Sequence, residues 1–412
     1  MDLTGEQRSI AQGEAGPLLG KYMNWLIAWG EAMGAKRLVP VRSVHAMLRT
    51  PSTRGCSRRT VEEYIAELRQ VCAHRVKCLT TTQVASAGSN YWRESGASQE
   101  EAAFESELRN LARRSGFQLT RTCTPYLVGN APLKGEVCAW TESSAVVYAN
   151  SILGARTTRH GMESSLAAAL LGVTPAFGEV LDENRRAELH IDVGVELRSE
   201  AEYGALGFYA SAVARSYIPV FTGIASLAAE DAKQISASLP YAESAISMFH
   251  VVGVTPEAPD LQTACGSRAP RVRLAFGARE LRDTFQAMTD LSPGEEVDTV
   301  ILGCPFASLW EIQRIAEGLA GRGIADSVQL WVATSYQTAM EAERLGFAEL
   351  IRESGGRLMH DACPGSAAIL GSRRVVTTSF KQAHHAQTVL GSRTAIASME
   401  RCLEAARKGR WG

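Results

Sequence analysis

Three cysteines, Cys123, Cys304 and Cys363, lie far apart in the chain but in similar local settings, each within two residues of a proline. Apolar runs typical of buried strands precede two of them, at residues 299–302 and 357–359. Open α/β sheets bind their ligands at such strand ends. Three thiolates that meet there without an obvious fourth ligand suit an iron-sulfur cluster with one iron open to substrate, because these clusters select soft thiolate ligands. The alternative is that the cysteines are small buried residues with inert thiols.

The sequence around these cysteines contains a series of longer motifs. They are Thr-Cys-Thr-Pro-Tyr at 122–126, Tyr-Ala-Asn-Ser-Ile-Leu-Gly-Ala-Arg-Thr at 148–157, Gly-Val-Thr-Pro at 172–175, Phe-His-Val-Val-Gly-Val-Thr-Pro-Glu at 249–257, Gly-Cys-Pro at 303–305 and Ser-Phe-Lys at 379–381. From about residue 120 onward the chain resembles the aconitase X family, and specifically the large subunit of its two-subunit members. The resemblance implies an iron-sulfur cluster held by Cys123, Cys304 and Cys363.

The resemblance also implies a hydro-lyase, for which the family offers two substrate branches. One dehydrates cis-3-hydroxy-L-proline to an enamine that becomes pyrroline-2-carboxylate, and the other dehydrates mevalonate 5-phosphate. We favour the hydroxyproline reaction because the sequence shows no Gly-rich phosphate-binding loop. The alternatives are the large subunit of a mevalonate 5-phosphate dehydratase and a catalytically inactive binding or scaffold protein with the same fold.

Dehydration of a hydroxy acid removes a proton beside the carboxylate and expels hydroxide from the neighbouring carbon, and a Lewis-acid iron stabilises the leaving oxygen. Arg156 can grip a carboxylate with both arms of its guanidinium, and Lys381 can stabilise an enolate-like intermediate. Glu142 follows Trp140 in an apolar setting, where burial would raise its pKa toward the acid-base range. The predicted catalytic residues are Glu142, Ser144 and Lys381, and the predicted substrate-binding residues are His45, Asn150, Ser151, Arg156 and Thr157.

Each candidate has a structural alternative. Arg156 could pair with a surface carboxylate. Ser144 and Ser151 could cap or pack helices. Glu142 could be buried and satisfied by backbone donors, and Lys381 could be a solvated surface charge.

The histidines also allow structural roles. His45 follows an extended segment and could face a cleft or be a partly buried structural residue. His250 lies in an apolar run typical of a core histidine. At most one of His384 and His385 should point into the site, because adjacent residues do not share a helix face.

Two positions depart from the family pattern. Members usually carry His after Gly-Cys-Pro, where this chain has Phe306. The family's Lys-Ala-Ala-His-Tyr is Lys-Gln-Ala-His-His at 381–385. If the missing histidine shapes the substrate pocket, the protein acts on a relative of the usual substrate.

A partner subunit is implied by the resemblance. In the family a small subunit, or an equivalent domain, carries a Gly-Ser-rich loop whose serine helps in proton transfer. The chain ends soon after the last matching segment and shows no Gly-Ser-Ser loop. We therefore expect a separate small subunit to dock over the cluster and complete the active site.

Strand and helix patterns alternate along the chain, which predicts layered α/β/α domains with largely parallel sheets and an aconitase-like fold. Helices are expected at 18–33, 60–72 and 98–115. The expected organisation is an N-terminal α/β region (1–120), a signature α/β region with the first cluster cysteine (121–258) and a C-terminal α/β domain with the other two (271–412). A proline-rich linker spans 256–270.

The composition excludes several classes of protein. With 412 residues, 45% of them hydrophobic, the chain can bury more than one core. A net charge of −1 provides no general field for nucleic acid or anionic lipid. We see no signal peptide and no apolar run of membrane-spanning length, and expect a cytoplasmic protein. Nine cysteines fit thiols and ligands better than a disulfide framework. The expected packing or surface thiols are Cys56, Cys72, Cys78, Cys265 and Cys402.

Overall fold

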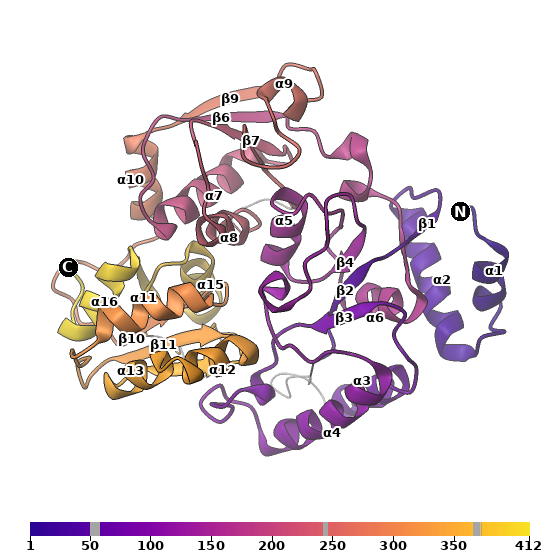
Figure 1. Cartoon of the computed structure of the whole chain (residues 1–412), viewed down its shortest axis with the longest axis horizontal. Helices are drawn as coiled ribbons and strands as arrows, with labels where there is room; N and C mark the ends of the chain where they lie inside the picture. The colour runs from indigo at the N-terminus through magenta and orange to yellow at the C-terminus, as the bar shows by residue number, and fades with distance from the viewer. Residues whose placement is uncertain (50–57, 242–245, 366–370, 372) are drawn as a thin grey trace.

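The computed structural model describes residues 1–49, 58–241, 246–365, 371 and 373–412. Three α/β units surround a common centre, with the first on the right of Figure 1, the second at the top and the third on the left. The described residues form a parallel sheet in each unit and one small antiparallel sheet. The predicted α/β class with largely parallel sheets is therefore confirmed. Cys56 lies outside the described residues.

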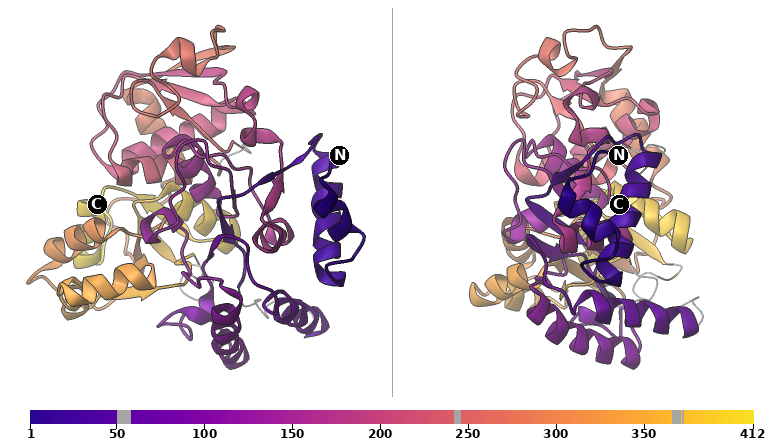
Figure 2. Two further views of the ribbon diagram at one scale, coloured as in Figure 1. Left: turned by 45° about the vertical axis from the view of Figure 1, so that its right-hand side comes forward. Right: turned by 90° about the vertical axis from the view of Figure 1, so that its right-hand side faces the viewer.

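The first unit is built on a parallel sheet of order β3-β2-β4 and an antiparallel pair, β1 and β5. Its central strand, β2, is buried at every position. Its helices α1 and α2 lie on the far side of the molecule from the third unit (Figure 2). The elements are α1 (Gly5–Ala11), α2 (Pro17–Ala32), β1 (Leu38–Pro40), β2 (Ser43–Ala46), α3 (Arg58–Val71), β3 (Leu79–Thr82), η1 (Ser86–Gly88), α4 (Gln99–Ser115), η2 (Pro125–Val128), β4 (Cys138–Trp140), α5 (Ser143–Ser151), α6 (Met162–Leu171), β5 (Val173–Pro175), η3 (Gly178–Val180) and η4 (Asp182–Asn184).

The three predicted N-terminal helices are present as α2, α3 and α4. Helix α4 begins after Ser98, whose side chain and that of Glu101 form a capping box, and it ends at Gly116 in the left-handed conformation. Helix α3 begins at Arg58, two residues before the predicted start at Thr60.

The second unit has a four-stranded parallel sheet of order β8-β7-β6-β9. Helix α8 packs against α7 of its own unit, α5 of the first unit and α15 of the third. The elements are β6 (Leu189–Val193), α7 (Glu200–Ala214), β7 (Pro219–Thr222), α8 (Ala229–Ser238), β8 (His250–Val251), α9 (Leu261–Ala264), β9 (Val272–Phe276) and α10 (Ala278–Ala287).

The third unit has a five-stranded parallel sheet of order β12-β11-β10-β13-β14. Its central strand, β10, is buried at every position. The elements are β10 (Thr299–Leu302), α11 (Leu309–Leu319), β11 (Gln329–Thr334), α12 (Tyr336–Arg344), α13 (Phe347–Glu353), β12 (Arg357–His360), β13 (Arg374–Thr377), α15 (Phe380–Leu390), β14 (Arg393–Ile396) and α16 (Met399–Lys408).

The main sheets of the three units therefore span residues 43–140, 189–276 and 299–396. The domain boundaries expected from the sequence stay predictions. No helix in the described part of the chain is both long and apolar enough to cross a membrane.

The turn after β10 requires glycine at position 303, and this requirement can be tested by substitution. It follows β10 with φ of 87°, and a Cβ there would lie 2.1 Å from the carbonyl oxygen of Ala333. Gly303→Ala should lower the free energy of unfolding by more than the roughly 1–2 kcal/mol that left-handed geometry alone costs. Gly294→Ala is the control, because its φ is 86° and nothing lies within 4 Å of a Cβ there. Urea titration measures both losses, and equal losses would contradict the expected backbone clash at position 303.

Candidate active site

Two of the predicted cluster ligands lie at the carboxyl edge of the third sheet. Cys304 follows β10 immediately after Gly303, and Cys363 lies shortly beyond β12. Both strands run parallel to β11, which lies between them. Cys123 comes from the first unit, just before η2. The predicted position of Cys304 and Cys363 at strand ends is confirmed.

The three thiols share one electrostatic neighbourhood. Cys304 interacts electrostatically with both Cys123 and Cys363. The backbone N–H of Phe306 donates a hydrogen bond to Sγ of Cys123 over 3.2 Å. Within the described ranges, no group of three or more His, Cys, Asp or Glu side chains is already arranged to hold a metal ion. The chemistry of a three-thiol set fits an iron-sulfur cluster, which selects soft thiolate ligands.

Lys381 is the cation that these thiols share. Burial raises the pKa of the Cys123 thiol and raises the pKa of Cys304 to about 12, while Lys381 acts in the opposite direction on both. A cysteine is a metal ligand only as the thiolate. Lys381 therefore favours the ligand form of both thiols.

Glu142 and Lys381 form a buried ion pair between the first and third units. The Lys381 Nζ lies 2.7 Å from Oε1 of Glu142, and the two side chains are 13% and 15% exposed. Although burial disfavours a charged carboxylate, Lys381 lowers the pKa of Glu142 below its ordinary value. The predicted rise in the pKa of Glu142 is therefore wrong, because the ion pair outweighs burial. Glu142 in turn raises the pKa of Lys381 against the effect of burial.

The amino end of α5 adds neutral donors next to this pair. Glu142 is the N-cap residue of α5, but its side chain accepts a hydrogen bond from Lys381 and makes no capping bond. Ser144 lies in the first turn, and its buried Oγ has no hydrogen-bond partner among the described residues. The first backbone N–H groups of a helix lack intrahelical acceptors. A bound ligand could therefore use Ser144, whose catalytic role stays a prediction.

His45 is fully buried and has both ring nitrogens in internal hydrogen bonds. Nδ1 lies 2.9 Å from Oγ1 of Thr81, and Nε2 lies 3.1 Å from the carbonyl oxygen of Thr122. Burial lowers the pKa of His45 to about 4, so its ring is neutral at neutral pH. These contacts favour the structural alternative, in which His45 supports the segment that leads to Cys123.

Asn150, Ser151 and Thr157 are also used inside the protein. Asn150 donates to the carbonyl oxygen of Thr157 over 2.8 Å and accepts from its N–H over 3.0 Å. Arg185 donates to Oδ1 of Asn150 over 3.2 Å, and Phe249 N–H donates to Oγ of Ser151 over 2.8 Å. The bond from Phe249 to Ser151 joins the second unit to the first. Substrate binding by the three residues stays a prediction.

Arg156 forms an ion pair with Asp182, with 2.5 Å between Nη1 and Oδ1. The Asp182 side chain is 83% exposed, so this contact is the surface pair weighed as an alternative for Arg156. Substrate binding by Arg156 stays a prediction. Arg159, which the sequence analysis did not select, interacts electrostatically with Glu142.

Phe306 does not replace the family's histidine as a site side chain. It is only 1% exposed and belongs to an apolar cluster with Ile301, Trp331 and Met359. If position 306 shapes the substrate pocket, it does so through its backbone and its packing behind Cys123. The Phe306 side chain makes no polar contact.

His250 and His385 contact backbone oxygens. His250 is buried with Nε2 at 2.8 Å from the carbonyl oxygen of Arg185, so the predicted core histidine is confirmed. His385 Nε2 lies 3.2 Å from the carbonyl oxygen of Gly365, next to the cysteine loop, and His384 packs near the ring of Phe208.

Two tyrosines in the site were not predicted from the sequence. The Lys381 ammonium lies 5.1 Å from the centre of the Tyr241 ring. Tyr126 interacts electrostatically with Cys123 and Glu142, and its buried hydroxyl has no hydrogen-bond partner in the described part of the chain. The place of Tyr126 three residues after Cys123 was the available signal, whereas nothing local marks Tyr241.

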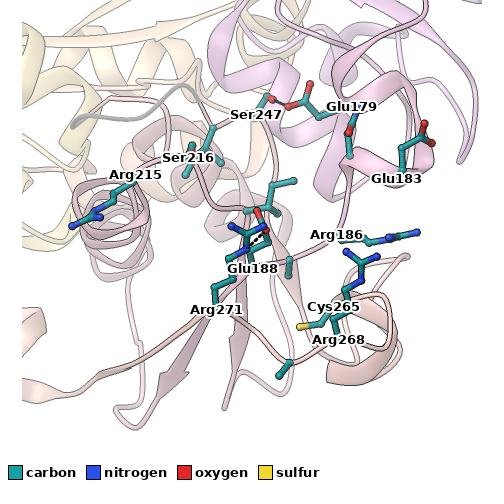
Figure 3. A pocket seen from close by; sticks show the side chains of 15 residues that line it. Glu179, Glu183, Arg186, Glu188, Arg215, Ser216, Ser247, Cys265, Arg268 and Arg271 are labelled. Atoms are coloured by element: carbon teal, nitrogen blue, oxygen red, sulfur yellow. Dashed lines mark hydrogen bonds and ion pairs between the residues drawn. The ribbon is translucent and has the colours of Figure 1, made fainter.

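A cavity of about 530 Å³ lies elsewhere, next to the amino ends of β6, β7 and β9. Figure 3 shows Arg186 and Arg268 on one side of it and the ion pair of Arg271 with Glu188 near its middle. It is lined by none of Cys123, Cys304, Cys363, Glu142 and Lys381. Cys304 and Cys363 follow the carboxyl ends of strands in the third sheet, whereas this cavity lies at the amino ends of strands in the second sheet, so it is not the candidate active site.

Comparison with known proteins matches almost the whole chain. Residues 1–183, 187–286 and 297–408 match the family models described as aconitase X first, second and third domain. The phosphomevalonate dehydratase large subunit of Methanothermobacter thermautotrophicus is 36% identical over 95% of this chain and 94% of that protein. The cis-3-hydroxy-L-proline dehydratase of Pseudomonas aeruginosa is 33% identical over 98% of this chain and 69% of that protein. The crystal structure of Thermococcus kodakaraensis aconitase X in its holo-form is similar, with a TM-score of 0.86, 31% identity and coverage of 98% of this chain and 100% of that one.

The ion pair of Glu142 with Lys381 predicts how stability depends on pH. Lys381→Met leaves a buried carboxylate without its cation and should cost roughly 3–5 kcal/mol at neutral pH. In the wild type the pKa of Glu142 is lowered, so the contribution of the pair is present at neutral pH and is lost as the pH falls through that lowered value. In the variant Lys381 no longer opposes burial, so the pKa of Glu142 is higher than in the wild type, and the deficit should shrink on acidification, when Glu142 takes up a proton.

Urea unfolding of both proteins at neutral and mildly acidic pH measures this difference. Lys408→Met is the control, because Lys408 forms an exposed pair with Glu404 and should change stability by no more than about 1 kcal/mol. A deficit in Lys381→Met that does not change with pH would contradict the assignment.

Proposed function

This chain belongs to the aconitase X family, and on that premise we propose that it is the large subunit of an iron-sulfur dehydratase acting on a small hydroxy acid. It is a hydro-lyase, as its relatives named dehydratases indicate. The observation that carries the proposal is the electrostatic grouping of Cys304 with Cys123, Cys363 and Lys381. The inactive scaffold considered from the sequence would have no need for this arrangement.

Cys123, Cys304 and Cys363 would hold the cluster. When bound, the cluster supplies a Lewis-acid iron that stabilises the departing hydroxide of the substrate. The remaining work falls to the protein. Lys381 carries a fixed positive charge at the centre of the site, which suits it to stabilise an enolate-like intermediate. Its bond to Glu142 holds the Nζ in one place, so little reorganisation is needed when negative charge develops on the substrate.

Glu142 acts in this proposal as the residue that orients Lys381. Its lowered pKa keeps the carboxylate ionised at neutral pH, where it accepts the Lys381 hydrogen bond and is not a proton donor. Ser144 Oγ has no hydrogen-bond partner among the described residues, and the first N–H groups of a helix lack intrahelical acceptors, so the amino end of α5 is suited to bind a substrate oxygen. The reaction also needs a base that removes the proton beside the substrate carboxylate. Neither Glu142 nor Lys381 has this role in the proposal, so the base would come from a small subunit.

The first candidate substrate is cis-3-hydroxy-L-proline, with pyrroline-2-carboxylate as the final product. A specific observation favours mevalonate 5-phosphate as the second candidate. Two relatives named phosphomevalonate dehydratase large subunit match along 94% and 100% of their length, whereas the two named cis-3-hydroxy-L-proline dehydratase each match along 69%. The relatives include both activities, so the assay must include both substrates.

A separate small subunit is the proposed partner, because the relatives named large subunits imply one. Docking over the cysteines would exclude water and should bury roughly 1,200–2,000 Å² of surface. The described cysteines are all free, which fits a reducing compartment such as the cytoplasm.

The cluster assignment predicts loss of iron in three single variants. Cys123→Ser, Cys304→Ser and Cys363→Ser should each lose most of the bound iron and visible absorbance of the anaerobically purified chain, because a hydroxyl is a poor ligand for iron in such clusters. Cys402→Ser is the control, since Cys402 is a buried residue of α16 that packs in the apolar core of the third unit. Wild-type iron content in all three variants would show that the ligands lie elsewhere, and a colourless, iron-free wild type would favour the scaffold.

The function is tested by co-expression with a candidate small subunit under anaerobic conditions. The purified complex should dehydrate one of the two hydroxy acids, measured as loss of substrate and formation of the unsaturated product. The large chain alone should have little or no activity, because its site lacks the partner's base. Full turnover by the chain without a second polypeptide would contradict the need for a partner, and no turnover of either substrate by an iron-loaded complex would reject both candidates.

A further inference from the structure

Lys233 is a buried cation to which the proposed reaction gives no role. It lies on α8 of the second unit, is 2% exposed and forms an ion pair with Glu311 on α11 of the third unit. Its Nζ also donates a hydrogen bond to the carbonyl oxygen of Phe306 over 3.0 Å. Burial of a charge is costly unless the charge is paired and hydrogen-bonded. Both acceptors belong to the third unit, so Lys233 joins the second unit to the segment that follows β10.

The backbone of Phe306 connects this lysine to the cysteines. Its carbonyl oxygen accepts from Lys233, and its N–H donates to Sγ of Cys123. Phe306 is separated from Cys304 only by Pro305. The residue after Lys233 acts on the same loop, because Gln234 Nε2 donates to the carbonyl oxygen of Cys304 over 3.4 Å. Two consecutive side chains of α8 thus hold both ends of the loop 304–306.

Glu311 fixes the other end of the same arrangement. Its Oε2 accepts from the backbone N–H of Ser308 over 2.8 Å in a capping box at the start of α11. Lys233 therefore holds Phe306 at the start of the segment 306–308, and its partner Glu311 holds Ser308 at the end. Because α8 also packs against α5 and α15, its position depends on all three units.

We propose that Lys233 is a positioning residue that holds the loop 304–306 so that the thiols of Cys304 and Cys123 face one another across the boundary between units. The proposal rests on the proposed function only for the identity of the bound group, the iron-sulfur cluster. Without a donor from α8, the Phe306 peptide is free to move and its hydrogen bond to Cys123 weakens. The ligand set is then complete only when the second unit is docked on the other two.

Two variants separate this role from the simple cost of a buried charge. Glu311→Gln removes the countercharge but keeps Lys233 and its bond to Phe306, and an amide at this position still accepts from Ser308. The double variant Lys233→Met with Glu311→Gln removes the bond to Phe306 and leaves no unpaired charge. The double variant should therefore be no less stable than Lys233→Met alone, which leaves Glu311 buried without a cation.

Three measurements apply to each full-length variant. They are the iron affinity of the anaerobically purified protein, the thermal midpoint, and the rate at which iodoacetamide alkylates each cysteine of the iron-free chain, followed by mass spectrometry. Cys138 and Cys402 are internal controls, because both are buried away from the loop and report general loosening of the fold.

Glu311→Gln should lower the thermal midpoint and leave iron affinity and the alkylation of Cys304 close to the wild type. The double variant should lose roughly 10- to 100-fold in iron affinity, the usual effect of removing a group that orients ligands. Its Cys304 and Cys123 should be alkylated faster while Cys138 and Cys402 are unchanged.

The proposal is overturned if the double variant keeps wild-type iron affinity and Cys304 alkylation, or if all four cysteines become reactive together. If the wild type binds no iron, the proposed function fails, yet the alkylation of Cys304 and Cys123 in the iron-free chain still tests the positioning role.

Discussion

The buried ion pair between Lys381 and Glu142 is the interaction on which the site depends. Burial disfavours the thiolate form of Cys123 and Cys304, and Lys381 is the cation that opposes this effect at both. An isolated buried ammonium would lose its proton or move toward solvent. Glu142 prevents both, because it raises the pKa of Lys381 and holds its Nζ by a hydrogen bond. The pair also joins α5 of the first unit to α15 of the third, so the charge exists in place only in the assembled fold.

The sheets supply the positions that this charge serves. A parallel strand that ends at the sheet edge must turn away from its neighbour, and glycine allows the turn to pass close to the neighbouring backbone. Gly303 does so after β10, and Gly223 does the same after β7, where a Cβ would lie 2.2 Å from the carbonyl oxygen of Val193. The turn after β10 presents Cys304 directly, whereas the turn after β7 leads toward α8 and thus to Lys233. A glycine turn at the end of a strand therefore positions both Cys304 and helix α8, whose Lys233 holds the loop 304–306.

Local patterns in the sequence were sufficient for the fold class, for the helices α2 and α4 and for the placement of Cys304 and Cys363 after strands. They failed where the answer depends on a distant partner. Trp140 correctly indicated that Glu142 is buried, but the sign of its pKa shift is set by Lys381, 239 residues away. The hydrogen bonds that the Asn150 amide makes with Thr157 and Arg185 were likewise not evident from the sequence, and substrate binding by Asn150 stays a prediction. Lys233 carries no local signal at all, because its acceptors come from another unit.

The Phe306 position shows how a change next to a cysteine can leave the polar site intact. Its side chain packs with Ile301, Trp331 and Met359 in an apolar cluster that also contacts Cys123. The backbone N–H of Phe306 donates to Cys123, and its carbonyl oxygen accepts from Lys233. A histidine in the same place would have to bury an imidazole among apolar side chains or turn toward the thiols, and either choice would alter the surroundings of Cys123. Phenylalanine avoids this cost. The difference from the usual family residue therefore acts on the packing behind Cys123, a proposed cluster ligand, and its effect on substrate choice stays a prediction.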